Sequence, residues 1–268
     1  MTVRSLAPRL RGQRKRARQA DLCAAEWIKF WSLRSTPIAL VLGVALSLYL
    51  VGNNCRHGVP GPAGAGGRLS PERAAFDGFS WLPAMIGAGL LGAQSTVGEY
   101  TSGLIRTTLA AVPDRRGVGT AKIVVVAAIA AAAALVIAAG GLALGFAILH
   151  GPGPAGARPV RAIWSSVLLL PVCALVGMAF GTLLRHAAGS AIAVCALFGF
   201  VTPMLRPDDN RWATDAANAM PYYAWGRLTA AGGSATGTMT VTVAWATLAA
   251  WAAVSIVITI LALDRRDV

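Results

Sequence analysis

The sequence predicts an all-α, polytopic membrane protein with six transmembrane helices, and three observations support this fold class. Six apolar stretches of 18 to 27 residues contain no Lys, Arg, Asp or Glu, and about 20 apolar residues let an α-helix cross about 30 Å of hydrocarbon. Charged residues make up only 13% of the 268-residue chain, against about 25% in a soluble domain. The mean hydropathy is +0.60. The predicted spans are residues 36–53, 79–97, 123–149, 162–184, 187–205 and 239–263.

Residues 1–21 form a basic tail ahead of the predicted helices. The chain carries 24 Lys+Arg against 11 Asp+Glu, a formal net charge of +13. Every charged residue before Asp21, which is the first acid, is a Lys or an Arg. Because this positive charge is concentrated in one terminal segment, we interpret it as a topology signal at the cytoplasmic surface of a membrane. Specific nucleic-acid binding, which such a charge would suggest in a soluble protein, is not expected here.

Residues 22–35 predict an amphipathic elbow helix before the first span. Its apolar residues recur with the spacing i, i+3, i+4, i+7 that places them on one helical face, and they are Ala24, Trp27, Ile28 and Trp31. Glu26 and Lys29 lie on the opposite face. Since Pro37 breaks the helix between this segment and the first span, we expect a separate helix in the inner membrane interface. The alternative is that the segment is only the solvated end of the first span.

The distribution of basic residues predicts the orientation of the six spans. If the N-terminus is inside, 16 Lys+Arg lie on the cytoplasmic side and eight lie outside, which satisfies the positive-inside rule. The six-span domain, residues 36–268, then leaves both termini in the cytoplasm. We expect a multi-pass protein of the cell membrane.

Two of the predicted outer loops differ in character. Residues 55–78 are rich in Gly and Pro, so we expect a flexible cap that packs no core. Residues 206–238 contain charged side chains followed by the aromatic segment 220–225. Aromatic residues of this kind settle at the headgroup level of a bilayer, so the sequence predicts a short interfacial segment there, with substrate gating as the alternative.

The chain lacks the motifs of an enzyme that hydrolyses ATP or uses a dinucleotide. None of its three lysines, Lys15, Lys29 and Lys122, follows a glycine as a phosphate-binding loop requires. Residues 87–92 match GxGxxG, but they lie inside a span rather than after a strand. We therefore interpret these glycines, like those at 141, 145, 177 and 181, as sites of close helix packing.

Catalysis, metal binding and ion coupling also lack a sequence signal. The three His and four Cys residues form no HExxH or CxxC motif, and no His lies inside a span to activate a serine nucleophile. We expect no catalytic residues, no cofactor and no metal. The spans also carry no acid or base at mid-membrane, which disfavours an ion-coupled carrier.

The loop between the second and third spans has the pattern of a short helix. Leu104, Ile105, Thr108 and Leu109 form an apolar ridge, Arg106 lies on the polar side, and Pro113 ends the segment. Such a helix at the cytoplasmic face presents a docking surface. The alternative is a plain connector.

Three motifs of the chain are similar to those of a known transporter family. They are Ala25-Glu26-Trp27-Ile28-Lys29 with Leu33-Arg34-Ser35-Thr36, then Glu99 to Leu109 with Val112-Pro113 and Ala121-Lys122, and the closing segment Leu261 to Asp267. With these motifs and six spans, the chain resembles the ABC-2 type permease subunits of actinobacterial ATP-binding-cassette exporters. The resemblance implies that the elbow and the loop after the second span contact a separately encoded ATPase. The residues to which it gives this coupling role are Glu26, Trp27, Lys29, Arg34, Glu99, Tyr100, Gly103, Leu104, Ile105, Arg106 and Leu109.

The function predicted from the sequence is therefore that of a permease subunit without catalysis of its own. It would move an amphiphilic or hydrophobic substrate outward, powered by a separate ATPase subunit, and it would work in the bilayer beside a second permease copy or a homologous permease. One alternative is a non-transporting immunity or scaffold protein built on the same spans. Another is an ion-coupled secondary transporter, because uncharged ion sites can be built from broken helices.

Overall fold

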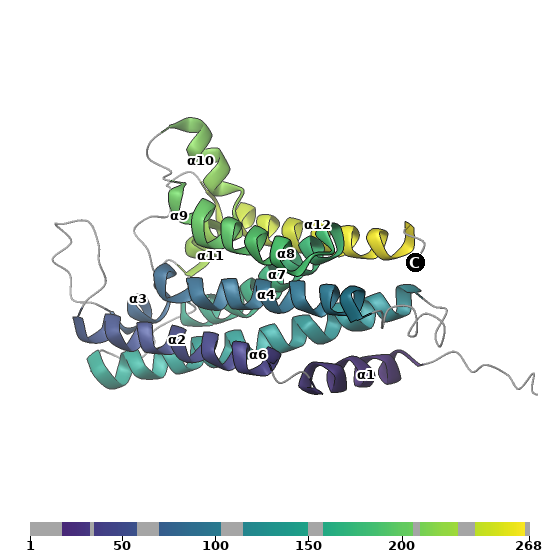
Figure 1. The fold of residues 1–268 in the computed structure, drawn as a ribbon. Helices are drawn as coiled ribbons and strands as arrows, with labels where there is room; N and C mark the ends of the chain where they lie inside the picture. The colour runs from purple at the N-terminus through teal and green to yellow at the C-terminus, as the bar shows by residue number, and fades with distance from the viewer. Residues whose placement is uncertain are drawn as a thin grey trace, which may run out of the picture.

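The computed structural model describes residues 18–32, 35–57, 70–102, 115–149, 158–205, 210–229 and 239–265. This part of the chain is almost entirely helical, and six of its helices are long and apolar enough to cross a membrane. The predicted all-α fold with six candidate spans is confirmed. As Figure 1 shows, helix α1 and the end of α12 lie at one end of the bundle, while α3, α10 and α11 lie at the other. We call these the α1 end and the α11 end.

The long helices cover the predicted spans and extend several of them by a few polar residues. They are α2 (Ser35–His57), α4 (Gly78–Ser102), α6 (Arg115–Leu149), α7 (Arg158–Leu184), the segment α8 (Ala187–Val194), η1 (Cys195–Val201) and α9 (Thr202–Met204), and α12 (Val241–Arg265). The shorter helices are α1 (Gln19–Ser32), α3 (Pro71–Ala75), α10 (Arg211–Asn218) and α11 (Pro221–Thr229).

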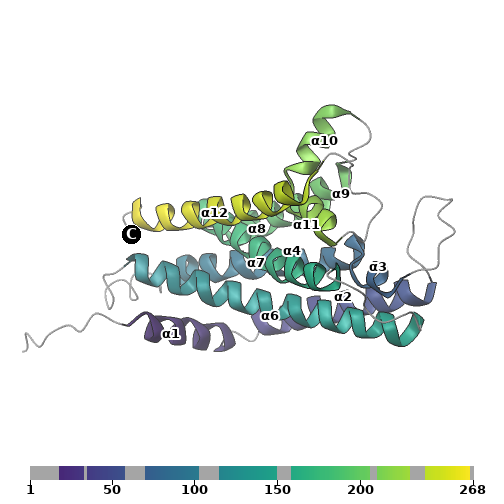
Figure 2. The same ribbon diagram turned by 180° about the vertical axis from the view of Figure 1, so that it is seen from behind.

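Helices α4, α6 and α7 form the centre of the bundle. Within the most apolar 18 residues of these spans, 56%, 50% and 67% of the residues are buried, respectively. The corresponding buried fraction is 22% in α2, in the α8 to α9 segment and in α12. Figures 1 and 2 show α4 and α7 between a layer that contains α2 and α6 and a layer that contains α8 and α12. The outer helices expose many large apolar side chains, which suits contact with lipid rather than with water.

Glycines bring α4 and α7 into backbone contact. A methyl group built on Gly92 would lie 1.8 Å from the carbonyl oxygen of Ala174, and one on Gly177 would lie 1.8 Å from the carbonyl oxygen of Gly89. Gly181 is equally restricted, because its methyl group would lie 2.0 Å from Thr96 Oγ1. The prediction of close helix packing is confirmed for Gly92, Gly177 and Gly181 but not for Gly87, whose added methyl group would meet nothing within 4 Å. The GxGxxG segment lies in the middle of helix α4.

A π-helix interrupts the fifth span at Cys195–Val201 and ends two residues before Pro203. Proline lacks an N–H group, and its ring clashes with the carbonyl group four residues earlier in a regular α-helix. The wider turn moves the hydrogen bonds by one residue, since the Thr202 backbone N–H donates to the Leu197 carbonyl oxygen. The Thr202 hydroxyl donates to the same oxygen at 2.7 Å. The Tyr223 hydroxyl of α11 donates to the carbonyl oxygen of Leu205, where this span ends.

The expectation that residues 55–78 pack no core is wrong for residues 70–77. Ser70 caps α3 by accepting a hydrogen bond from the Arg73 backbone N–H at 3.2 Å, and Ala75 and Phe76 are buried in the core. Helix α3 can pack this closely on α6 because Gly145 of α6 has no side chain. A methyl group on Gly145 would lie 2.8 Å from the Pro71 carbonyl oxygen. Residues 58–69 of this loop lie outside the described residues.

Trp225 of the predicted interfacial aromatic segment, residues 220–225, points into the protein. Helix α11 packs against α7 and α12, and Trp225 is 1% exposed. The Trp225 indole N–H donates to Ser166 Oγ at 2.8 Å, and its ring centroid lies 5.2 Å from that of Trp81. Burial, reinforced by the neighbouring charge of Asp77, raises the pKa of Tyr222 to about 12. This segment therefore belongs to the core at the α11 end.

Candidate functional site

The residues predicted to couple to a partner gather around the α1 end as far as the structure describes them. Glu26, Trp27 and Lys29 lie on α1, while Glu99 and Tyr100 lie in the helical backbone near the end of α4. The remaining predicted residues fall outside the described part of the chain, and they are Arg34, Gly103, Leu104, Ile105, Arg106 and Leu109.

One face of α1 packs on helix α6. Its residues Gln19, Cys23, Glu26 and Phe30 are spaced i, i+4, i+7 and i+11, which aligns them along one side of a helix. The Gln19 side-chain amide donates to the Gly117 carbonyl oxygen at 3.2 Å and to Thr120 Oγ1 at 2.8 Å. Glu26 and Phe30 are each 8% exposed. This face fixes α1 against the first turns of α6.

The opposite face of α1 is apolar and exposed. Trp27, Ile28 and Trp31 are 47%, 68% and 52% exposed, and the two tryptophan rings meet edge to face with centroids 5.8 Å apart. The predicted division of the helix into an apolar face and a face with Glu26 and Lys29 is therefore confirmed. The structure adds that the face with Glu26, which also carries Cys23 and Phe30, lies against the rest of the protein.

The centre of this contact is a cluster of one acid and two lysines. Glu26 Oε1 lies 2.6 Å from Lys29 Nζ, and Glu26 Oε2 lies 3.1 Å from Lys122 Nζ. The side chains of Glu26 and Lys122 are 9% and 6% exposed. Because an unpaired charge at such a buried position would cost several kcal/mol, the pairing stabilises both side chains where they are.

Lys122 extends the cluster to a third helix. Its ammonium group donates to the Ser95 carbonyl oxygen of α4 at 3.0 Å, close to the end of that helix. Lys122 itself stands near the start of α6. The ion pair therefore joins α1 to the two helices between which residues 103–114 run.

The pairing of Glu26 with Lys122 was missed from the sequence. The resemblance assigned Glu26 to a partner protein, whereas its carboxylate binds two lysines of its own chain. The signal that would have found this partner is the lone lysine at position 122, which directly precedes a long apolar stretch. A buried lysine at the start of a span needs a nearby acid.

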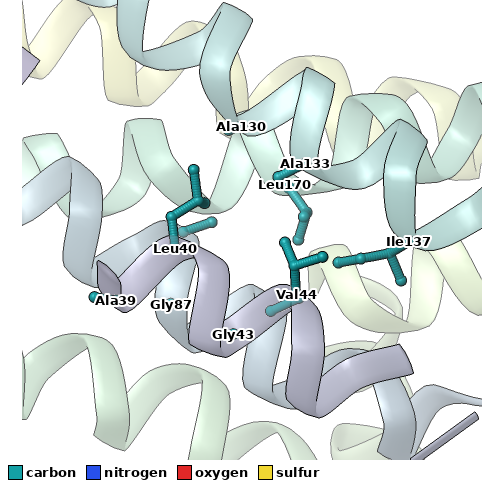
Figure 3. A pocket seen from close by; sticks show the side chains of 11 residues that line it. Ala39, Leu40, Gly43, Val44, Gly87, Ala130, Ala133, Ile137 and Leu170 are labelled. Carbon is teal, nitrogen blue, oxygen red and sulfur yellow. The ribbon is translucent and has the colours of Figure 1, made fainter. Parts of the chain in front are cut away.

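The described residues offer little for metal or ligand chemistry. Among them, no group of three His, Cys, Asp or Glu side chains could hold a metal ion. Figure 3 shows a recess between α2, α4, α6 and α7, lined by residues such as Leu40, Gly87 and Ile137. Its lining has no polar side chain and it is too small for an amphiphilic molecule.

The fold and this cluster define a multi-pass, α-helical membrane protein whose N-terminal helix is fastened to the ends of two core helices. No known protein family and no curated protein sequence matches the chain. A functional assignment therefore depends on the residues themselves.

Proposed function

We propose that the chain is the membrane-spanning permease subunit of an ABC-2 type exporter, driven by a separate ATPase subunit. The observation that carries the proposal is the buried Glu26–Lys122 pair, which joins α1 to the helices on either side of residues 103–114. These are the two segments through which the resemblance implies contact with an ATPase. Such a connection would transmit a force applied at the α1 end to the core helices.

The α1 end is cytoplasmic in this proposal, and the α11 end faces outward. The 16 to 8 distribution of Lys+Arg supports this orientation. The exposed face with Trp27, Ile28 and Trp31 then lies in the inner interface, where tryptophan is favoured. The protein resides in the cell membrane with both termini inside.

The proposed mechanism is alternating access imposed from the cytoplasm. Closure of an ATPase dimer displaces α1 and the loop at residues 103–114, and the Glu26–Lys122 pair transfers this displacement to α4 and α6. The glycine contacts between α4 and α7 pass it to the centre of the bundle. In this proposal the substrate pathway runs between this chain and a second permease copy or a homologous permease.

The orientation is tested by thiol labelling in a cysteine-free background. In intact cells, a membrane-impermeant maleimide should label His57→Cys and Arg211→Cys. Both substitutions are at exposed positions near the α11 end. It should label the exposed position Ala188→Cys only after permeabilisation. Native Cys55, which the proposed topology places outside, is a poor reporter because it is 6% exposed. Labelling of Ala188→Cys in intact cells would reverse the proposed topology.

The coupling role of the loop is tested by two substitutions that leave the spans intact. Gly103→Pro should misdirect the predicted Leu104, Ile105 and Leu109 ridge, so that co-purification of the ATPase and its stimulation are both lost. Glu99→Ala should weaken the contact by roughly 1 to 3 kcal/mol, through loss of one charge-assisted interaction.

The matched control for these variants is Trp212→Ala, which changes an exposed residue on α10 at the opposite end. It should leave both readouts at the wild-type level. If Gly103→Pro also retains co-purification and stimulation, the loop is a plain connector and the coupling assignment is wrong.

A further inference from the structure

We infer that α2, the first span, is hinged: its C-terminal half is anchored to the bundle, and its N-terminal half swings against α4 and α6. The C-terminal half comprises residues 47–57, at the α11 end, and the N-terminal half comprises residues 37–46. The inference depends on the packing of α2 alone. Its use in a transport cycle rests on the proposed function.

The burial of α2 changes abruptly along its length. Within residues 37–46 no residue is buried, and Val41 and Leu42 are 64% and 63% exposed. The buried residues of this helix all lie in its C-terminal half, and they are Ser47, Val51, Asn54 and Cys55. The two halves of one helix therefore differ in how firmly they pack on the bundle.

A position at the edge of the bundle does not explain this change. The α8 to α9 segment and α12 have the same buried fraction as α2, 22% of their most apolar 18 residues. Their buried residues, however, recur along the whole span, from Ser190 to Thr202 and from Ala244 to Ala262. Both of these outer spans contact the core from end to end, whereas α2 does so over one half.

The C-terminal half of α2 is held by polar and apolar contacts together. The Asn54 side-chain amide donates to Ser80 Oγ at 2.9 Å and to Asp77 Oδ2 at 3.1 Å, at the start of α4. No other described side chain of α2 makes a hydrogen bond to a different helix. Val51 packs in a buried cluster with Ala74 of α3. These contacts fix one end of the helix.

The N-terminal half of α2 faces the recess of Figure 3, which Gly43 and Gly87 both line. A methyl group built on Gly87 would meet nothing within 4 Å, and one on Gly43 would meet the Pro83 carbonyl oxygen at 3.9 Å. At the boundary between the two halves, Ser47 Oγ is buried without a hydrogen-bond partner. An open recess and an unsatisfied hydroxyl group both weaken the packing of this half.

These contacts define a pivot near Asn54. Rotation about it moves the N-terminal half toward α4 and α6, which closes the recess, or away from them into lipid. Closure would bring Gly43 and Gly87 together, as glycines already join α4 to α7. Neither movement exposes a buried side chain, because residues 37–46 contain none. Regions with few buried contacts are those that open most readily in a folded protein.

The experiment compares two spin-label distances to one reference position, in a cysteine-free protein reconstituted in lipid. The reference is Leu168→Cys, an exposed position on the well-buried helix α7. Val41→Cys reports on the N-terminal half of α2, and Asn53→Cys, also at an exposed position, reports on the C-terminal half. Cys55 is replaced by alanine, which is also small and apolar. The distance distribution from Val41→Cys should be about twofold broader than that from Asn53→Cys.

Gly87→Leu tests the role of the recess. A leucine side chain at this position occupies the recess and prevents closure, so the distribution from Val41→Cys should narrow toward its longer distances. The matched control is Gly52→Leu, because a methyl group on Gly52 also meets nothing within 4 Å, but this glycine lies in the anchored half. It should leave both distributions as they are in the wild type.

Asn54→Ala tests the anchor. The substitution removes both hydrogen bonds to α4 and leaves the Ser80 backbone N–H bonded to Asp77 Oδ2 at 3.2 Å, so the start of α4 keeps its cap. The distribution from Asn53→Cys should then become as broad as that from Val41→Cys.

The inference is overturned if the two wild-type distributions are equally narrow. It is also overturned if folded Gly87→Leu leaves the distribution from Val41→Cys unchanged, or if Asn54→Ala leaves that from Asn53→Cys narrow. The wild-type comparison decides the matter if neither variant folds. ATPase co-purification is a separate measurement. If no ATPase binds even the wild-type protein, the proposed function fails, while the distance measurements still decide whether α2 is hinged.

Discussion

Replacing Gly92 with alanine should prevent the native packing of α4 on α7. The added methyl group would lie 1.8 Å from the Ala174 carbonyl oxygen, and this atom belongs to a helix backbone that cannot rotate away as a side chain would. The helices must separate, which forfeits contacts along the most buried pair of helices in the bundle. We expect a loss of about 3 kcal/mol in the free energy of unfolding. The measurement is the fraction of monodisperse protein that survives heating in detergent.

Gly87→Ala is the matched control for this variant. Gly87 belongs to the same GxGxxG segment of α4, yet a methyl group built on it meets nothing within 4 Å. Alanine is the better helix former by about 1 kcal/mol, so this variant should be as stable as the wild type or slightly more stable. Equal behaviour of Gly92→Ala and Gly87→Ala would contradict the account of α4 and α7.

Trp225→Ala should have a comparable effect at the α11 end. The substitution removes a 1% exposed indole ring, its contact with Trp81 and its hydrogen bond to Ser166. The cavity and the lost hydrogen bond should together cost about 3 to 5 kcal/mol. The midpoint of thermal unfolding in detergent measures this loss.

Trp212→Ala provides the comparison for the indole at position 225. Its ring is 68% exposed on α10, so its removal should change stability by no more than about 0.5 kcal/mol. Ser166→Ala removes the acceptor of the buried Trp225 indole N–H without opening a large cavity, so it should cost about 1 to 3 kcal/mol. If Trp225→Ala is as mild as Trp212→Ala, α11 does not belong to the core.

The long helices of this fold were predictable because a membrane span has a simple physical signature. An apolar stretch without charges and near 20 residues long has few other structures available to it. Helix α1 was predictable from a different signal, the recurrence of Trp27, Ile28 and Trp31 on one face. Its bounds differ from the prediction by about three residues, because polar residues such as Gln19 continue a helix that apolar periodicity does not mark.

The packed segments outside the spans were not predictable from composition. Gly- and Pro-rich sequence indicated a loop at residues 55–78, and nothing local to it shows that Gly145 of α6 leaves room for Pro71. Tryptophan favours the headgroup region of a bilayer, so composition alone places Trp225 there. Its burial depends on Ser166 and Trp81, which are distant in the sequence.

The candidate site was predictable in its location but not in its contacts. Sequence patterns identified α1, the segment after α4 and the lysine at 122 as features of the same end. The periodicity also placed Glu26 and Lys29 opposite the apolar face of α1. It could not show that the face with Glu26 turns toward the protein, because the acid is paired with a lysine on another helix.

The central claim is that this chain couples a separate ATPase to movement of a substrate across the membrane, and its most direct test is ATP hydrolysis in reconstituted vesicles. The ATPase that co-purifies with the detergent-solubilised protein should hydrolyse ATP faster when this chain is present, and Gly103→Pro should abolish the increase. Hydrolysis that is the same with and without the chain, or the absence of any co-purifying ATPase, would contradict the account and favour a non-transporting membrane scaffold.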